Sequence, residues 1–175
     1  MPLPEPITPA ASRQPGLRWL WLAAWVLGLD QLTKLAVIET LVPYQDVVPV
    51  IAGFFNLVHV HNPGAAFSLF ADQPGWQRGF FIAVAAIASV VILVLLRRTR
   101  GQPLFCAALA LILGGAVGNV IDRALYGHVI DFIDWYLILD GQPWHWPAFN
   151  VADAGISIGA VLLVLDSLKK DPQHV

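Results

Sequence analysis

The chain has 175 residues, of which 57% are hydrophobic and 13% charged, and its mean hydropathy is +0.66. These values favour a polytopic membrane protein over a soluble domain. The formal net charge of −2 gives no reason to expect a nucleic-acid partner, and the single cysteine, Cys106, excludes a disulfide within the chain.

Residues 1–16 hold five prolines among small and polar residues, a composition that predicts a disordered tail. Each of the four apolar segments that follow has about the 20 residues that a spanning helix needs. These segments are residues 17–38, 79–96, 103–121 and 149–168. We therefore predict an all-α polytopic membrane protein with one four-helix domain over residues 17–168 and a second short tail over residues 169–175.

The first apolar segment has a rival interpretation as a signal peptide, because its first half follows Arg13 and Arg18. No small-residue cleavage site comes after it, however, and the apolar pattern resumes beyond Asp30. We therefore interpret it as the first span.

Basic residues predict the orientation of the spans. Seven of the ten Lys and Arg residues fall on one side, and they are Arg13, Arg18, Arg97, Arg98, Arg100, Lys169 and Lys170. The other side holds Lys34, Arg78 and Arg123, together with nine of the twelve acidic residues. Both termini are therefore predicted to be cytoplasmic, and chemistry performed by the carboxylates is expected at the outer face.

Two loops are expected on that outer face. Residues 42–75 contain four prolines, and the run Phe54–His61 within them is rich in β-branched and aromatic residues, which predicts a small β-sheet on the membrane surface. The loop before the fourth span carries Trp135, Tyr136, Trp144 and Trp146, and we expect these aromatic residues to anchor it at the lipid headgroups.

Polar residues at helical spacing accompany the first and third spans. Asp30 and Lys34 are four residues apart, so they share a helix face, either as an ion pair that brings two charges into the interface or as a functional pair. Asn119, Asp122 and Arg123 lie on one stripe of the third span. Asp122 is therefore expected to contact a basic group or to join a hydrogen-bond network at the helix ends.

Three further patterns have structural explanations beside functional ones. Asn62 opens a turn and could cap the next helix or offer its amide to a peptide ligand. Asn150 and Asp153 are three residues apart, and either could cap the fourth span. Gly114 and Gly118 would permit close helix approach.

Asp131 and Asp153 follow the third span and begin the fourth, so antiparallel packing can bring them together. A carboxylate at the bilayer centre costs about 3 kcal/mol, so acidic groups near spans are usually functional. Two adjacent carboxylates share one proton, and the ionised one can activate water while the protonated one polarises a carbonyl. That is hydrolysis of the aspartic-protease kind. Asp134 could share a helical face with Asp131, and periodicity does not separate these two candidates.

Other chemistries have weaker support in the sequence. His59 and His61 would face the same way on a strand, but no third ligand accompanies them, so a metal site is not expected. A Ser–Lys catalytic pair would need Lys34 with a serine such as Ser68. A small proton-coupled carrier using the same carboxylates would need acids near the midplane, whereas these gather at one face. A non-catalytic assembly factor, with the polar residues only capping helices, is the third alternative.

Five short blocks occur in order between residues 17 and 168, and together they resemble the bacterial lipoprotein signal peptidases, also called signal peptidase II. The blocks are Asp30-Gln31-Leu32-Thr33-Lys34, Asn62-Pro63-Gly64-Ala65-Ala66-Phe67, Gly118-Asn119-Val120-Ile121-Asp122-Arg123, Val129-Ile130-Asp131-Phe132 and Phe149-Asn150-Val151-Ala152-Asp153.

This resemblance implies a four-helix aspartic endopeptidase of the bacterial inner membrane, without a cofactor and with its active site facing the periplasm. It implies a prolipoprotein substrate, cut just before a cysteine that carries diacylglycerol. Asp131 and Asp153 correspond to the catalytic pair. The supporting and substrate-positioning residues correspond to Asp30, Lys34, Asn62, Asn119, Asp122, Arg123 and Asn150. We expect a monomer that contacts membrane lipids, with the sheet and the aromatic loop clasping the substrate.

Overall fold

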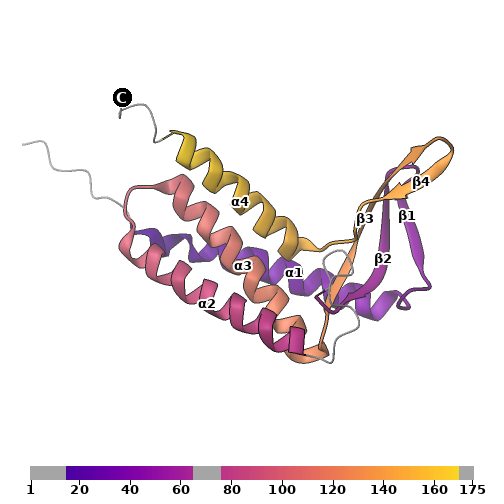
Figure 1. The fold of residues 1–175 in the computed structure, drawn as a ribbon, viewed down its shortest axis with the longest axis horizontal. Helices are drawn as coiled ribbons and strands as arrows, with labels where there is room; N and C mark the ends of the chain where they lie inside the picture. The colour runs from indigo at the N-terminus through magenta and orange to yellow at the C-terminus, as the bar shows by residue number, and fades with distance from the viewer. Residues whose placement is uncertain (1–14, 65–75, 170–175) are drawn as a thin grey trace, which may run out of the picture.

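The computed structural model describes residues 15–64 and 76–169, which form four helices with a β-sheet at one end of the bundle (Figure 1). Both ends of the described chain, at η1 and at the last turn of α4, lie at the opposite end of the bundle from the sheet. All four helices are long and apolar enough to cross a membrane. The prediction of four spans is therefore confirmed.

The short 3₁₀ helix η1 (Gly16–Trp19) leads directly into the first helix. The helices are α1 (Leu20–Thr40), α2 (Trp76–Arg98), α3 (Pro103–Tyr126) and α4 (Val151–Lys169). The predicted third span, residues 103–121, was too short, because α3 continues five residues beyond Ile121. Asp122 and Arg123 interrupt the apolar pattern but remain in the helix. α1 likewise runs past Asp30 without a break.

α3 is the centre of the bundle, because α1, α2 and α4 all contact it. Glycines let the helices approach closely. A Cβ on Gly114 would lie 2.5 Å from the carbonyl oxygen of Ala23 in α1, and one on Gly118 would lie 2.6 Å from Oδ2 of Asp30. On the other side of α3, a Cβ on Gly115 would collide with the carbonyl oxygen of Ala152 in α4. The predicted close approach at Gly114 and Gly118 is confirmed.

The sheet has four antiparallel strands in the order β1-β2-β3-β4. Its strands are β1 (Val47–Ile51), β2 (Phe55–Asn62), β3 (Val129–Leu139) and β4 (Gln142–His145). The sheet predicted within residues 42–75 is confirmed for β1 and β2, while residues 65–75 lie outside the described part of the chain.

The aromatic loop expected before α4 is instead the β3–β4 hairpin over residues 129–145, and its anchoring at the lipid headgroups stays a prediction. Its two turn residues, Asp140 and Gly141, have φ values of 51° and 75°. A two-residue turn with both φ values positive matches the twist of the flanking strands. The hairpin also corrects the idea that Asp131 and Asp134 share a helical face, since residues three apart on a strand point to opposite faces.

The passage from α3 to β3 depends on Gly127, which ends the helix in the left-handed conformation with φ of 84°. Its N–H donates to the carbonyl oxygen of Arg123 at 3.1 Å. A side chain at this position would be strained, so glycine lets the chain leave the helix and enter β3 two residues later. Asp131 follows as the third residue of that strand.

A buried ammonium group joins α1 to α3. The Nζ atom of Lys34 lies 2.8 Å from Oδ2 of Asp30 and 2.7 Å from Oδ2 of Asp122, and all three side chains are at most 2% exposed. Nζ donates hydrogen bonds to Oδ2 of Asp30 and, at 3.1 Å, to Oδ1 of Asn119, and it forms an ion pair with Asp122. The predicted Asp30–Lys34 ion pair and the predicted basic partner for Asp122 are confirmed, but the pair is fully buried instead of interfacial.

Both acidic partners of Lys34 extend the network to other elements. Oδ1 of Asp30 accepts the backbone N–H of Ala152 at 2.9 Å, which satisfies a donor in the first turn of α4. Oδ2 of Asp122 accepts the N–H of Ile130 in β3 at 3.2 Å. Gln31 donates to both Asp30 (3.1 Å) and Asp122 (3.0 Å). This Lys34 network therefore ties α1, α3, α4 and β3 together.

Replacing Gly115 by alanine should lower the free energy of unfolding by about 1–3 kcal/mol, because the methyl group meets backbone atoms of α4 that cannot turn away. Gly28→Ala is the matched control, since no atom lies within 4 Å of the added Cβ. It should be neutral or stabilising by up to about 1 kcal/mol. Denaturant titration in detergent micelles measures both, and equal stability of the two variants would contradict the packing described for α3 and α4.

Lys34→Met should cost about 3–5 kcal/mol of unfolding free energy, because it leaves two buried carboxylates without their common cation. Lys169→Met, at the exposed last turn of α4, is the control and should change stability by less than about 0.5 kcal/mol. Thermal or denaturant unfolding in micelles tests the pair of variants. A Lys34→Met protein as stable as the Lys169→Met protein would show that the network does not hold the helices together.

Candidate active site

Asp131 is buried at the third position of β3, with 2% of its surface exposed. Two side-chain amides donate to its carboxylate. Nδ2 of Asn150 lies 2.7 Å from Oδ1, and Nδ2 of Asn62 lies 3.0 Å from Oδ2. Asn62 is the last residue of β2 and pairs with Val129 of β3, so the sheet register brings its amide to Asp131.

Neither explanation offered for Asn62 by the sequence included this bond. Its Oδ1 accepts the N–H of Gly64 at 2.9 Å, which closes a local turn, and the helix it was expected to cap falls on residues outside the described part of the chain. The amide nitrogen of Asn62 therefore donates to Asp131, while its amide oxygen accepts from the backbone of Gly64.

Asp153 lies in the first turn of α4 and is partly exposed. Its Oδ1 accepts Nδ2 of Asn119 at 2.7 Å, and its Oδ2 faces the backbone N–H of Asn150 at 3.3 Å. In return, Oδ1 of Asn150 accepts the N–H of Asp153 at 2.9 Å. Asn150 and Asp153 thus cap the start of α4 reciprocally, as in a capping box, which confirms the capping interpretation for both.

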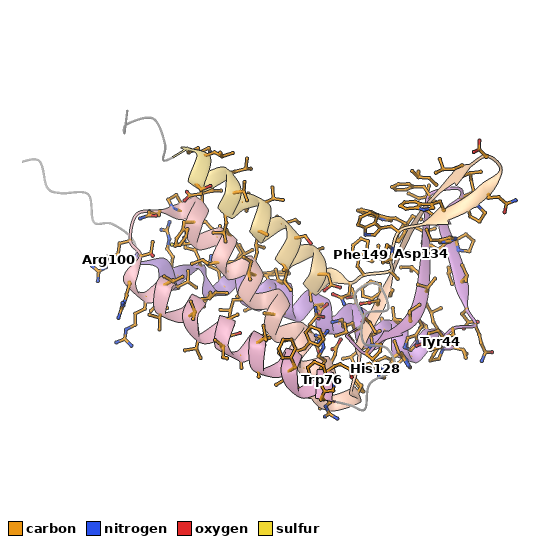
Figure 2. All side chains as sticks on the ribbon, viewed as in Figure 1. Tyr44, Trp76, Arg100, His128, Asp134 and Phe149 are labelled. Carbon is orange, nitrogen blue, oxygen red and sulfur yellow. The ribbon has the colours of Figure 1, made fainter. Side chains whose placement is uncertain are left out.

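The segment before α4 is held beside β3. The N–H of Phe149 donates to the carbonyl oxygen of Ile133 at 3.1 Å, and the N–H of Ile133 donates to the carbonyl oxygen of Phe149 at 2.8 Å. Figure 2 shows Phe149 where the chain passes from the sheet into α4. The next residue, Asn150, therefore contacts both carboxylates, Asp131 through its side chain and Asp153 through its backbone.

Burial, with a smaller contribution from the nearby charge of Asp153, raises the pKa of Asp131 to about 7, although the amides of Asn62 and Asn150 and the charge of Lys34 oppose the rise. A carboxyl group with this pKa is largely protonated just below neutral pH. The site therefore has one carboxyl group that retains a proton beside a second one that is more open to solvent.

Arg123 brings a positive charge to the same place. Its guanidinium interacts electrostatically with both aspartates and with Asp122, and it lies 5.0 Å from the centre of the Phe81 ring. Its Nη1 donates to the carbonyl oxygen of Asn119 at 3.3 Å. Its Nε is buried and has no hydrogen-bond partner among the residues that the structure describes.

The structure brings all nine predicted site residues into one connected region. The Lys34 network lies beneath the two carboxylates, and Asn119 links the two levels, since its Oδ1 accepts from Lys34 and its Nδ2 donates to Asp153. Sequence reasoning missed Gln31 and Phe149 as members of this region. Both belong to blocks that carry the family resemblance, but their partners lie about 90 and 16 residues away, so local spacing gave no signal.

Asp134 lies on the other face of β3 from Asp131. Its Oδ2 accepts Nδ2 of Asn56 at 2.8 Å, and its Oδ1 lies 2.7 Å from Nδ1 of His145. Figure 2 shows Asp134 within the sheet. The structure therefore separates it from the pair formed by Asp131 and Asp153.

His59 and His61 do face the same way, with their Nε2 atoms 3.2 Å apart, as expected for alternate residues of a strand. The His61 ring stacks on that of His128 at 3.8 Å between centroids. Burial lowers the pKa of His61 and of His128 from the usual value, and repulsion within the cluster adds to the effect. Among the described residues, no group of three or more His, Cys, Asp or Glu side chains is arranged to hold a metal ion.

The model of the family described as signal peptidase (SPase) II matches residues 22–169. The lipoprotein signal peptidase of Ralstonia nicotianae is 57% identical over 153 residues, which cover 87% of this chain and 84% of that protein. The lipoprotein signal peptidase of Cupriavidus necator is 52% identical over 165 residues, covering 94% and 90%.

A solved bacterial membrane enzyme, determined by the in meso method at 1.9 Å resolution, has the same fold. It is 28% identical, with a TM-score of 0.77 over 93% of this chain and 100% of that one. Because the family model spans most of the sequence and the named relatives are more than half identical, this chain belongs to the signal peptidase II family and is a membrane protease.

Proposed function

We propose that the protein removes signal peptides from diacylglyceryl-modified prolipoproteins, cutting before the lipidated cysteine with water activated by Asp131 and Asp153. The observation that carries this proposal is the shared hydrogen-bond network, in which Asn150 contacts a buried carboxyl group with a pKa of about 7 and a second, partly exposed carboxylate. Two carboxyl groups in different environments are suited to divide the acid and base roles.

In the proposed reaction, ionised Asp153 takes a proton from a water molecule whose oxygen attacks the scissile carbonyl carbon. Protonated Asp131 donates a hydrogen bond to the carbonyl oxygen, which becomes a hydroxyl group in the tetrahedral intermediate. The nitrogen of the leaving cysteine then accepts the proton held by Asp153, and the C–N bond breaks as Asp131 recovers its proton. No metal or covalent intermediate takes part.

Supporting roles for the remaining site residues follow from their contacts. Asn62 and Asn150 orient Asp131, and Asn119 orients Asp153. Arg123 supplies positive charge that favours an ionised carboxylate in the pair. Asp30, Lys34 and Asp122 hold the helices and β3 in register beneath the pair.

The proposal includes the setting of the enzyme. Residues 17–168 would form a monomeric peptidase domain of the bacterial inner membrane, with lipids around it and the sheet and active site on the periplasmic side. Residues 1–16 and 169–175 would be cytoplasmic tails. The basic residues at the end opposite the sheet, Arg97, Arg98 and Arg100, support this orientation. The alternative of a proton-coupled carrier has no support, because the chain belongs to a peptidase family.

Asp131→Asn and Asp153→Asn should each lower the cleavage rate by at least about 10²–10⁴-fold, because each removes one proton-transfer group. Asp134→Asn is the matched control, because this aspartate lies on the other face of β3, and its rate should stay within a few-fold of the wild type. The assay follows cleavage of a diacylglyceryl-modified precursor peptide by purified protein, with thermal unfolding to show that each variant is folded. An active Asp153→Asn enzyme would refute the two-carboxylate mechanism.

The pH dependence tests which group carries the proton. Because the pKa of Asp131 is raised to about 7, the protonated form is lost as pH rises through 7, and kcat/KM should fall by about tenfold per unit above that value. Asn62→Ala removes an amide that favours ionised Asp131, so it should raise this pKa and move the basic limb of the profile to higher pH. A basic limb that moves downward, or does not move, would mean that another group titrates.

A further inference from the structure

A cleft of about 500 Å³ opens beside Asp153 along the exposed side of α4. Its lining consists of Trp135, Trp146 and Phe149 from the sheet end of the molecule and Asp153, Ala154, Ser157 and Ile158 from α4. Apart from the carboxylate and the hydroxyl group of Ser157, these side chains offer mainly apolar surface. α4 runs away from the sheet (Figure 1), so the cleft leads from the carboxyl pair toward the middle of the bundle.

We propose that this cleft binds one acyl chain of the diacylglyceryl group on the substrate cysteine, and that Ser157 and Ile158 determine which chain lengths fit. This inference rests on the proposed function and adds a binding site to it. Ser157 and Ile158 are specificity-determining residues here, since neither touches the reacting atoms.

The covalent structure of such a substrate places an acyl chain near this cleft. The lipid is attached through the sulfur of the cysteine, so its first glycerol carbon is four bonds from the scissile nitrogen, roughly 5 Å. When the scissile bond reaches Asp153, the mouth of the cleft is therefore within reach of the glycerol, since Asp153 itself lines the cleft. An acyl chain leaving it can follow α4, where Ser157 lies about 6 Å further along the helix axis than Asp153.

Its lining separates this cleft from the grooves expected on any membrane helix. A groove of about 270 Å³ on α1 and one of about 520 Å³ between α1 and the sheet are lined by no charged side chain among the described residues. The α4 cleft includes Asp153 together with an aromatic wall that is rigidly built. The Trp135 and Phe149 rings meet edge to face at 4.9 Å, and the N–H of Trp146 donates to the carbonyl oxygen of Trp135 at 2.8 Å.

Binding of the acyl chain in this cleft would fix the position of the substrate cysteine more than it would raise the affinity for the substrate. Lipid tails already surround the substrate chain, so its transfer into an apolar cleft open to lipid gains little hydrophobic free energy. What the cleft can supply is a fixed place for the cysteine relative to the carboxyl pair, and small misplacements at a reacting centre cost large factors in rate. Filling the cleft should therefore affect long-chain substrates through kcat/KM.

The test crosses variants with chain length. Precursor peptides carry a cysteine with two butanoyl or two palmitoyl chains, and kcat/KM is measured for wild type, Ser157→Phe and Ala86→Phe in the same micelles. Ser157→Phe should lower the palmitoyl-to-butanoyl ratio of kcat/KM by about tenfold, because the ring blocks the path of the longer chain. Ala86→Phe adds the same ring to an exposed groove on α2 that none of the cleft residues line, and its ratio should match the wild type.

A Ser157→Phe enzyme that slows both substrates equally, or neither, overturns the inference. An equal change of the ratio in Ala86→Phe also overturns it, since the effect would then belong to lipid-facing helix surfaces in general. Ile158→Ala should shift the ratio in the opposite direction from Ser157→Phe by lengthening the path.

A second readout does not need turnover. In the Asp131→Asn protein, a precursor with brominated acyl chains should quench tryptophan fluorescence, and Trp146→Phe should remove part of that quenching. Brominated bulk phospholipid at the same concentration should quench Trp146 less, and equal quenching by both would overturn the inference. Specific quenching by the precursor with no cleavage by the wild-type enzyme would sink the proposed function while leaving the cleft as a lipid-chain site.

Discussion

The structure depends on one buried cation. Lys34 is surrounded by Asp30, Asp122 and Asn119, and without their oxygens the burial of its ammonium group in an apolar bundle would cost several kcal/mol. Each acidic partner uses its remaining capacity on backbone N–H groups, one at the start of α4 and one at the start of β3. These are the two elements that carry Asp153 and Asp131. The same charges that hold the helices together therefore also fix where the two carboxyl groups stand.

The two carboxyl groups reach their common place by different kinds of secondary structure. Asp131 is inside a strand and covered by protein, whereas Asp153 belongs to a helix start that opens on a cleft. The difference in exposure raises the proton affinity of the first group above its ordinary value. In a symmetrical pair, either carboxyl group could hold the proton. Here the two groups already differ in exposure before a substrate binds, and the substrate would arrive from the side of the more exposed Asp153.

Hydropathy and length were enough to predict four spans, because a helix in lipid must satisfy its backbone internally over about 20 residues. They failed at the end of α3, where Asp122 pairs with Lys34 and Arg123 lies over the Phe81 ring, and in residues 129–145. In residues 129–145 the Asp140-Gly141 pair is typical of a hairpin turn. The strand before it, however, ends in three consecutive apolar residues, Leu137, Ile138 and Leu139, which are all exposed, so the sequence lacks the apolar–polar alternation of a half-buried strand. The candidate site residues were predicted from the five blocks. Their bonds were not predictable, since Asn150 meets Asp131 across 19 positions of chain.

The bond from Asp30 to the N–H of Ala152 makes the Lys34 network directional. Exchanging the residues at positions 30 and 34 would conserve the charge pair between neighbouring helical turns. It would also present an ammonium group to the positive end of the α4 dipole, where a carboxylate now accepts a hydrogen bond. The start of α4 therefore requires that the acid precede the base along α1. Inverting this order would remove a hydrogen bond between two helices that are far apart in the chain.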